Sequence, residues 1–364
     1  MKIPLASPSF DDEMKKAAVD ALCNERFVLG ESVFRFEEEF ARYCGVDYAV
    51  STSSGTSALQ LSLLALGVKR GDQVITTPAS FVATANVALH VDAVPVFADI
   101  DIKTYNVDPE LLEKKVTSKT RAAIPVHLYG FPADMNSILE ISREHGFAVV
   151  EDACQAHGAE YYGKKVGSMG DVGCFSFYPA KNMTVCGDGG MVVTDDEEIA
   201  GIVAKLRDCG RVSHYEHDTI GFTFRLDTVN AAIGRVQLRR LEGWNERRRA
   251  VAKLYSSLLS DLGEVVLPAN GGSVVKPVYH LYVIRTRFRD ELKAWLEQNG
   301  VQCGVHYPLP IHLQPVYREL FGYEEGDFPE SELLCKTALS LPMFPGLEKQ
   351  EVEYVCGKIH EFFD

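Results

Sequence analysis

The stretch Phe147-Ala148-Val149-Val150-Glu151-Asp152 decides the class of fold. Its four consecutive apolar residues are typical of a parallel strand covered on both faces, and the segment 122–126 has the same character. Between the two runs, Asp134 can begin a helix and Gly146 can end it. A strand, a helix and a second strand in this order predict an α/β fold with a buried parallel sheet.

The same alternation of helical and apolar stretches extends from Asp11 to about Val193, and a smaller α+β domain follows it. A long Arg-rich helix links the two parts, and we place the domain boundary on it, with a larger domain over 1–240 and a smaller one over 241–364. The elements expected are helices at 32–43 (begun by Ser32), 56–66, 228–262, 289–299 and 349–363, and strands at 48–51, 73–76, 279–285 and 301–307.

Composition excludes several classes of protein. The chain has 364 residues, enough for about two domains, and a net charge of -14, which repels nucleic acids and anionic membranes. Nine cysteines without a CxxC pair predict reduced thiols, and no segment is a signal peptide or a membrane span, so we expect a cytoplasmic protein. His214 and His217 have no third ligand beside them, so no metal site is predicted.

Three features could bind one ligand. Asp152 stands at the end of a strand, where open α/β sheets bind ligands, although a helix-capping role is as frequent. Lys181 lies among aromatic residues and glycines, which can desolvate its amine, whereas most lysines are solvated surface charges. The segment 53–57 could hold a phosphate at a helix start or be a plain N-cap. An amine, a carboxylate and a phosphate site together match pyridoxal phosphate.

The order of the motifs supports this interpretation. The chain resembles the DegT/DnrJ/EryC1/StrS sugar aminotransferases, a branch of the fold type I pyridoxal-phosphate enzymes. The resemblance implies a large domain with a mostly parallel seven-stranded sheet and a smaller C-terminal α+β domain. The segments that carry it are 27–30, 54–56, 151–155, 175–182, 187–190, 221–225, 306–308 and 340–342.

The resemblance implies roles for single residues. Lys181 would link covalently to the cofactor, Asp152 would keep its ring nitrogen protonated, and Gln155 would bind its ring hydroxyl. Phe81 would stack on the ring, although such an aromatic is more often part of a core. The phosphate ligands would be Gly55, Thr56 and Ser176.

Other implied roles concern the substrate and a second subunit. Thr223 and Arg225 lie in a motif that reaches the neighbouring subunit's site in a homodimer, and Thr223 replaces the usual Asn. Since Thr has no amide, it can offer the phosphate only the hydrogen bond of its hydroxyl. His306 and His312 resemble a segment near the substrate, although a packing role is about as frequent.

The expected function is transfer of an amino group from glutamate or glutamine to a nucleotide-linked keto sugar. Aminocyclitol aminotransferases share the lysine and stay open as an alternative, as does a non-enzymatic regulatory protein that binds pyridoxal phosphate. Lys181 argues against the dehydratases of the family, in which His replaces this lysine. A nicotinamide dehydrogenase is disfavoured because no GxGxxG follows an early strand.

Overall fold

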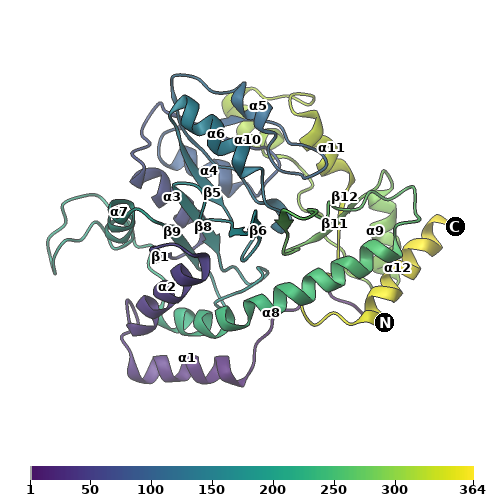
Figure 1. The fold of residues 1–364 in the computed structure, drawn as a ribbon, viewed down its shortest axis with the longest axis horizontal. Coiled ribbons are helices and arrows are strands. Elements are labelled where there is room, and N and C mark those ends of the chain that lie inside the picture. The colour runs from purple at the N-terminus through teal and green to yellow at the C-terminus, as the bar shows by residue number, and fades with distance from the viewer. Residues whose placement is uncertain (1) are drawn as a thin grey trace.

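The computed structural model describes residues 2–364, and its centre is a seven-stranded sheet (Figure 1). The strands lie in the order β1-β9-β8-β5-β4-β2-β3, and only β9 runs antiparallel to its neighbours. This confirms the mostly parallel sheet. The strands are β1 (Tyr48–Thr52), β2 (Gln73–Thr76), β3 (Val94–Phe97), β4 (Thr120–Ala123), β5 (Ala148–Asp152), β8 (Val172–Ser176) and β9 (Gly190–Thr194).

Helices cover both faces of the sheet because successive strand residues point to opposite sides. Val150 packs in one cluster with α3 (Gly55–Ala65), α4 (Ala83–His90) and α7 (Glu197–Arg207). Val149 packs on the other face with α5 (Pro109–Glu113) and α6 (Met135–His145). On that second face, Phe175 packs with α2 (Glu31–Cys44) and the first half of α8 (Thr228–Leu258). The apolar run at 147–150 therefore lies mainly in a strand buried on both faces, whereas the run at 122–126 overlaps β4 only at Ala122 and Ala123.

The C-terminal part has a separate core. The antiparallel pair β11 (Tyr282–Arg285) and β12 (Ala338–Leu341) packs with α9 (Arg289–Gln298), α12 (Lys349–Phe363) and the second half of α8. Ile3 belongs to the same core, since its N–H donates to the oxygen of Gly300 at 2.9 Å. The helix α8 thus contributes to both cores, and Figure 1 shows it running from below α2 to α12.

The remaining elements are short, apart from α1. They are α1 (Asp12–Asn24), η1 (Leu128–Gly130), η2 (Ile311–Leu313), α10 (Pro315–Phe321), α11 (Pro329–Thr337) and a small sheet of β10 (Val275–Lys276), β6 (Glu160–Tyr161) and β7 (Lys164–Lys165). Between residues 2 and 364, no helix combines the length and the apolar character that crossing a membrane requires.

Several expected elements differ from the structure. The helix α2 begins after Gly30, and the Ser32 hydroxyl donates to Glu25 Oε1 at 2.6 Å instead of capping the helix. The strand expected at 301–307 does not form, because Val301 pairs only with Ile3 and Gly304 only with Ser340. The last helix, α12, has the expected bounds.

Candidate active site

Asp152 is the last residue of β5, and its carboxylate is held from two sides. The backbone N–H of Cys154 donates to Oδ1 at 3.2 Å, and the hydroxyl of Thr84 donates to Oδ2 at 2.8 Å. The backbone is fixed as well, since the N–H of His127 donates to the oxygen of Asp152 at 3.1 Å. Each carboxylate oxygen keeps lone pairs that no protein donor uses, so Asp152 can still accept a hydrogen bond from a ligand.

The neighbouring Glu151 has a different environment. Its carboxylate accepts from His127 Nε2 at 2.9 Å and from three backbone N–H groups of the 167–170 loop at 2.6–2.7 Å. Burial raises the pKa of Glu151, but these hydrogen bonds outweigh burial and lower it. Glu151 therefore braces the loop, and of the two adjacent carboxylates only Asp152 is available for a ligand.

Lys181 lies in the segment that follows β8, with its backbone N–H bonded to the oxygen of Tyr178 at 2.9 Å. Burial lowers the pKa of its amine, while Cys154 and Asp152 act in the opposite direction. A lowered pKa increases the fraction of neutral amine at neutral pH, and the neutral amine is the nucleophile. Lys181 is therefore a half-buried lysine close to Asp152 and Cys154, which favours the desolvated amine over a solvated surface charge.

The start of α3 lies against the end of β8. Ser54 caps the helix, because its hydroxyl accepts from the N–H of Ser57 at 3.1 Å. A Cβ atom on Gly55 would lie 2.7 Å from Cβ of Ser176 and 2.8 Å from Sγ of Cys154, so only glycine permits this close approach. The first N–H groups of a helix have no partner within it and attract anions. Gly55, Thr56 and Ser176 therefore form a cradle that suits a phosphate group.

Gln155 and Phe81 both approach Tyr307. The Gln155 side chain accepts from the N–H of Tyr129 at 2.9 Å and donates to the Tyr307 hydroxyl at 3.3 Å. The ring centroids of Phe81 and Tyr307 are 6.0 Å apart, and Phe81 is 53% exposed. An exposed aromatic face beside a buried amide suits a planar ligand. Tyr307 belongs to the 306–308 motif, and the sequence alone does not indicate its contacts with Gln155 and Phe81.

His306 lies next to Tyr307 and faces the same region. Its Nδ1 is 2.9 Å from the hydroxyl of Ser340, and its backbone oxygen accepts from the Tyr129 hydroxyl. Burial and the charge of Lys181 lower the pKa of His306. The ring is therefore neutral at neutral pH, and its second nitrogen has no intramolecular bond among the described residues.

His312 lies in a different environment. It is fully buried, its ring packs 4.7 Å from that of Phe328, and its Nε2 is 3.2 Å from Glu332 Oε1. These contacts give His312 a packing role, and they leave it no surface for the substrate contact that the resemblance implied.

Thr223 and Arg225 follow the loop that projects after α7 (Figure 1). Thr223 is exposed, while Arg225 forms an ion pair with Asp208 that, despite some burial, raises the pKa of the guanidinium. The backbone N–H of Ser53 donates to the oxygen of Phe224 at 2.8 Å, so the segment passes beside the start of α3. Within one chain, the described contacts of Thr223 and Arg225 do not include Lys181 or Asp152.

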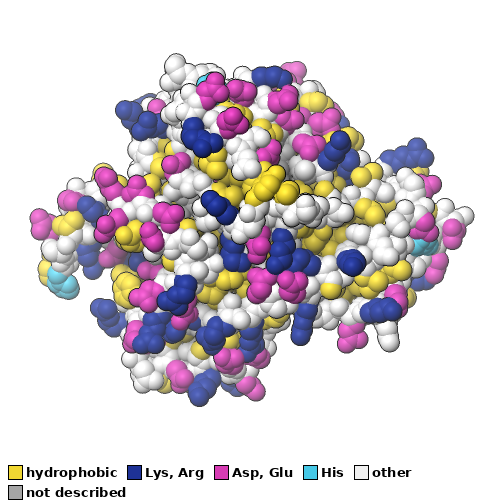
Figure 2. All heavy atoms as spheres, viewed as in Figure 1, with side chains coloured by type: hydrophobic (Ala, Val, Ile, Leu, Met, Phe, Trp, Pro, Cys, Tyr) yellow, Lys and Arg dark blue, Asp and Glu magenta, His cyan; other side chains and the backbone are white. Residues whose placement is uncertain are grey.

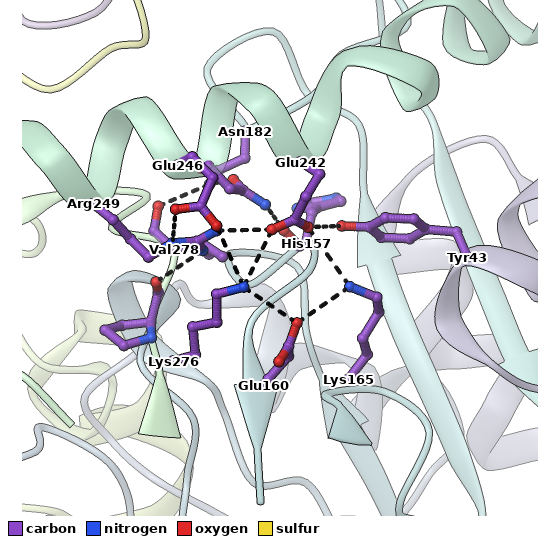
Figure 3. A network of polar contacts seen from close by, with 12 residues as sticks. Tyr43, His157, Glu160, Lys165, Asn182, Glu242, Glu246, Arg249, Lys276 and Val278 are labelled. Carbon is purple, nitrogen blue, oxygen red and sulfur yellow. Dashed lines mark hydrogen bonds and ion pairs between the residues drawn. The ribbon is translucent and has the colours of Figure 1, made fainter. Parts of the chain in front are cut away.

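Asn182 and Asn245 form a buried pair that sequence reasoning missed. The Asn182 amide donates to Asn245 Oδ1 at 2.9 Å and to the oxygen of Val278 at 3.1 Å, and Asn245 donates to the oxygen of His157 at 2.8 Å. Figure 3 labels Asn182 beside α8, the helix that carries Asn245. The pair ties the residue after Lys181 to the long helix and to the loop after β5. Nothing in the sequence around Asn182 or Asn245 indicates that the two side chains bind each other.

A network of charges surrounds this pair on the surface of α8. Glu242 and Glu246 of the helix bind Arg249 at 2.8 and 2.7 Å. Lys276 of β10 and Lys165 of β7 each form ion pairs with Glu242 of the helix and with Glu160 of β6 (Figure 3). Figure 2 shows acidic and basic side chains side by side over the middle of α8. These pairs fix the small sheet to the helix that carries Asn245.

The sheet order and the arrangement of Lys181, Asp152 and the glycine cradle define the class of fold type I pyridoxal-phosphate-dependent transferases. The model of the DegT/DnrJ/EryC1/StrS aminotransferase family matches residues 8–360, so the chain belongs to this family. The resemblance inferred from the motifs is thereby confirmed.

Individual relatives extend over nearly the whole chain. A "pleiotropic regulatory protein" of Geobacillus stearothermophilus is 43% identical and covers 100% of this chain and 99% of its own length. The dTDP-3-amino-3,4,6-trideoxy-alpha-D-glucose transaminase of Streptomyces venezuelae is 41% identical and covers 96% and 92%. The crystal structure of S. venezuelae DesV with a ketimine intermediate superposes with a TM-score of 0.95 at 40% identity, covering 99% and 98%.

Proposed function

We propose that this protein is an aminotransferase that uses pyridoxal phosphate to transfer an amino group from glutamate or glutamine to a nucleotide-linked keto sugar. The observation that carries the proposal is the placement of Lys181, with its lowered pKa, in the same site as Asp152 and the glycine cradle. Similarity to transaminases of dTDP- and UDP-linked sugars supports the substrate class. Cytoplasmic location agrees with the solubility of such substrates.

Each residue of the candidate site would have a separate role in the reaction. Pyridoxal phosphate supplies an aldehyde that can carry nitrogen and a ring that stores electrons. Gly55, Thr56 and Ser176 would hold its phosphate. Asp152 would face its ring nitrogen, and Phe81 would cover the ring.

Lys181 would have two tasks. Its Nζ would anchor the cofactor covalently between turnovers. It would then take a proton from the α-carbon of the amino donor and deliver one to the sugar carbon that receives nitrogen. The lowered pKa of Lys181 suits both tasks, because a neutral amine is required for attack and for proton abstraction. His306, neutral for the same reason of burial, would offer a ring nitrogen to the sugar.

We further propose a homodimer in which each site uses Thr223 and Arg225 of the neighbouring chain. The projecting loop before Thr223 exposes apolar side chains, with Tyr215 87% and Ile220 90% accessible. Such residues are typical of an interface. An isologous dimer buries both loops and makes the two sites equivalent.

The test is a panel of dTDP- and UDP-linked keto sugars incubated with the purified protein, pyridoxal phosphate and glutamate or glutamine. We expect an amino sugar in the mass spectrum and none with Lys181→Ala. The name of the 43% identical relative gives a specific reason to consider a regulatory protein instead. Cofactor binding without amino transfer to any keto sugar or aminocyclitol precursor would favour that alternative and contradict the proposal.

A further inference from the structure

A directed chain of hydroxyl groups leads to Asp152. The ionised carboxylate can only accept hydrogen bonds, so the single hydroxyl hydrogen of Thr84 points to Oδ2 at 2.8 Å. Ser80 Oγ lies 2.8 Å from Thr84 Oγ1, and since the hydrogen of Thr84 is used, Ser80 must donate. Ser80, Thr84 and Asp152 are all buried. Water therefore does not compete for these bonds.

The same turn of chain also carries Phe81. The N–H of Thr84 donates to the oxygen of Phe81 at 3.1 Å, which closes the turn at the start of α4. One short segment therefore supplies an aromatic face to the site and a hydrogen bond to its carboxylate. Any displacement of this turn moves Phe81 and the donor to Asp152 together.

We propose that Thr84 is a positioning residue of the transamination reaction. Its hydroxyl fixes the plane of the Asp152 carboxylate, with the N–H of Cys154 as the second fixed donor on Oδ1. Without Thr84 Oγ1, the bond at 3.2 Å is the one hydrogen bond from residues 2–364 that restrains the side chain, and the carboxylate can turn about its last bond. Ser80 acts through Thr84 by orienting the hydroxyl. This inference rests on the proposed function, because it assigns a purpose to the orientation of Asp152.

The test compares three full-length variants loaded with pyridoxal phosphate that carries ¹⁵N in its ring. Thr84→Val keeps the shape and removes the hydroxyl, and Thr84→Ser keeps the hydroxyl. The matched control is Thr76→Val, because Thr76 is equally buried and donates to the oxygen of Ile124 at 2.8 Å, whereas the described donors to the Asp152 carboxylate are Thr84 and Cys154. The measurements are the ring-nitrogen chemical shift as a function of pH, the dissociation constant of the cofactor, and kcat and KM.

We expect Thr84→Val to lower kcat about 10-fold with an unchanged KM for the sugar, since a hydrogen bond to a charged group contributes about this factor or more. The ring nitrogen should lose its proton at lower pH, and the cofactor should bind about 5-fold to 10-fold more weakly. For Thr84→Ser and Thr76→Val, kcat, KM and the dissociation constant of the cofactor should stay within about twofold of the wild type, and the ring nitrogen should titrate as in the wild type.

Two results would overturn the inference. One is a Thr84→Val protein that matches Thr76→Val in kcat and in the nitrogen titration. The other is failure of Thr84→Ser to retain both, which would show that a hydroxyl at this position is not what orients Asp152. Failure of the proposed function has a different signature, because the wild type itself would then bind no cofactor or show no turnover.

Discussion

Substituting Gly55 by alanine tests the close approach of α3 to β8. The new Cβ would lie 2.7 Å from Cβ of Ser176, a contact that requires either α3 or the end of β8 to move. Overpacking of this kind costs about 1–3 kcal/mol, while replacing glycine by alanine in a helix contributes up to about 1 kcal/mol in the favourable direction. The expected net change is a loss of about 0–3 kcal/mol in the free energy of unfolding.

Gly243 provides the matched control. It lies on the exposed side of α8, and a Cβ placed there meets nothing within 4 Å. Gly243→Ala should therefore raise the free energy of unfolding by about 0.5–1 kcal/mol. The two substitutions are chemically identical, so the difference between them, about 1–3 kcal/mol, measures the close approach alone.

The assay is urea unfolding of the cofactor-free proteins, followed by titration of each with pyridoxal phosphate. Because the Gly55 cradle is also the proposed phosphate site, Gly55→Ala should weaken cofactor binding at least about 10-fold, equivalent to about 1.4 kcal/mol. Gly243→Ala should bind like the wild type. Equal stabilisation by both substitutions would refute the packing argument, and equal cofactor affinity would refute the phosphate assignment.

Three further outcomes are expected. Burial lowers the pKa of Lys181, so the folded protein binds fewer protons than the unfolded chain. Cofactor-free wild type should therefore gain stability relative to Lys181→Met as the pH rises from 7 to 10, by about 1.4 kcal/mol for each unit by which the pKa of Lys181 is lowered. A thermal-unfolding difference between the two proteins that does not change with pH would contradict this. Asp152→Asn should bind the cofactor yet lower the single-turnover rate with the amino donor about 100-fold, because the ring nitrogen loses its charged partner; an unchanged rate at full occupancy would show that Asp152 is not that partner. Mixing inactive Lys181→Ala and Arg225→Ala chains should restore about a quarter of wild-type activity if sites are shared between subunits, and no recovery after demonstrated exchange would exclude sharing.

The sequence predicted best what depends on local pattern. β2 at Gln73–Thr76 and α12 at Lys349–Phe363 have the expected bounds, because apolar periodicity and flanking polar residues define both. The expected strand at 301–307 failed for a tertiary reason. Its pairing partners are Ile3 and Ser340, which are distant in sequence and contact it at single positions.

In the candidate site, too, the sequence indicates features of local pattern and does not indicate contacts between distant segments. The sequence singles out Lys181 and Asp152 because each stands in a distinctive stretch, and the structure brings their segments to the same end of the sheet. Thr84, Asn182 and Asn245 were missed because their roles consist of contacts between separate segments, such as the 2.8 Å bond from Thr84 to Asp152. For His312, the resemblance implied a place near the substrate. In the structure, the side chain of His312 packs against Glu332 and Phe328.

The position of Ile3 has a consequence for the order in which the chain folds. Ile3 is buried in one core with residues of α8 and α12, and Figure 1 shows these two helices side by side at the end of the molecule where that core lies. During synthesis, residue 3 is made long before α12 at 349–363. The C-terminal core therefore cannot close until α12 has emerged from the ribosome, whereas the seven-stranded sheet is complete once Thr194 has emerged. An early-made segment thus packs against segments that are made much later, and long-range closure of this kind slows folding.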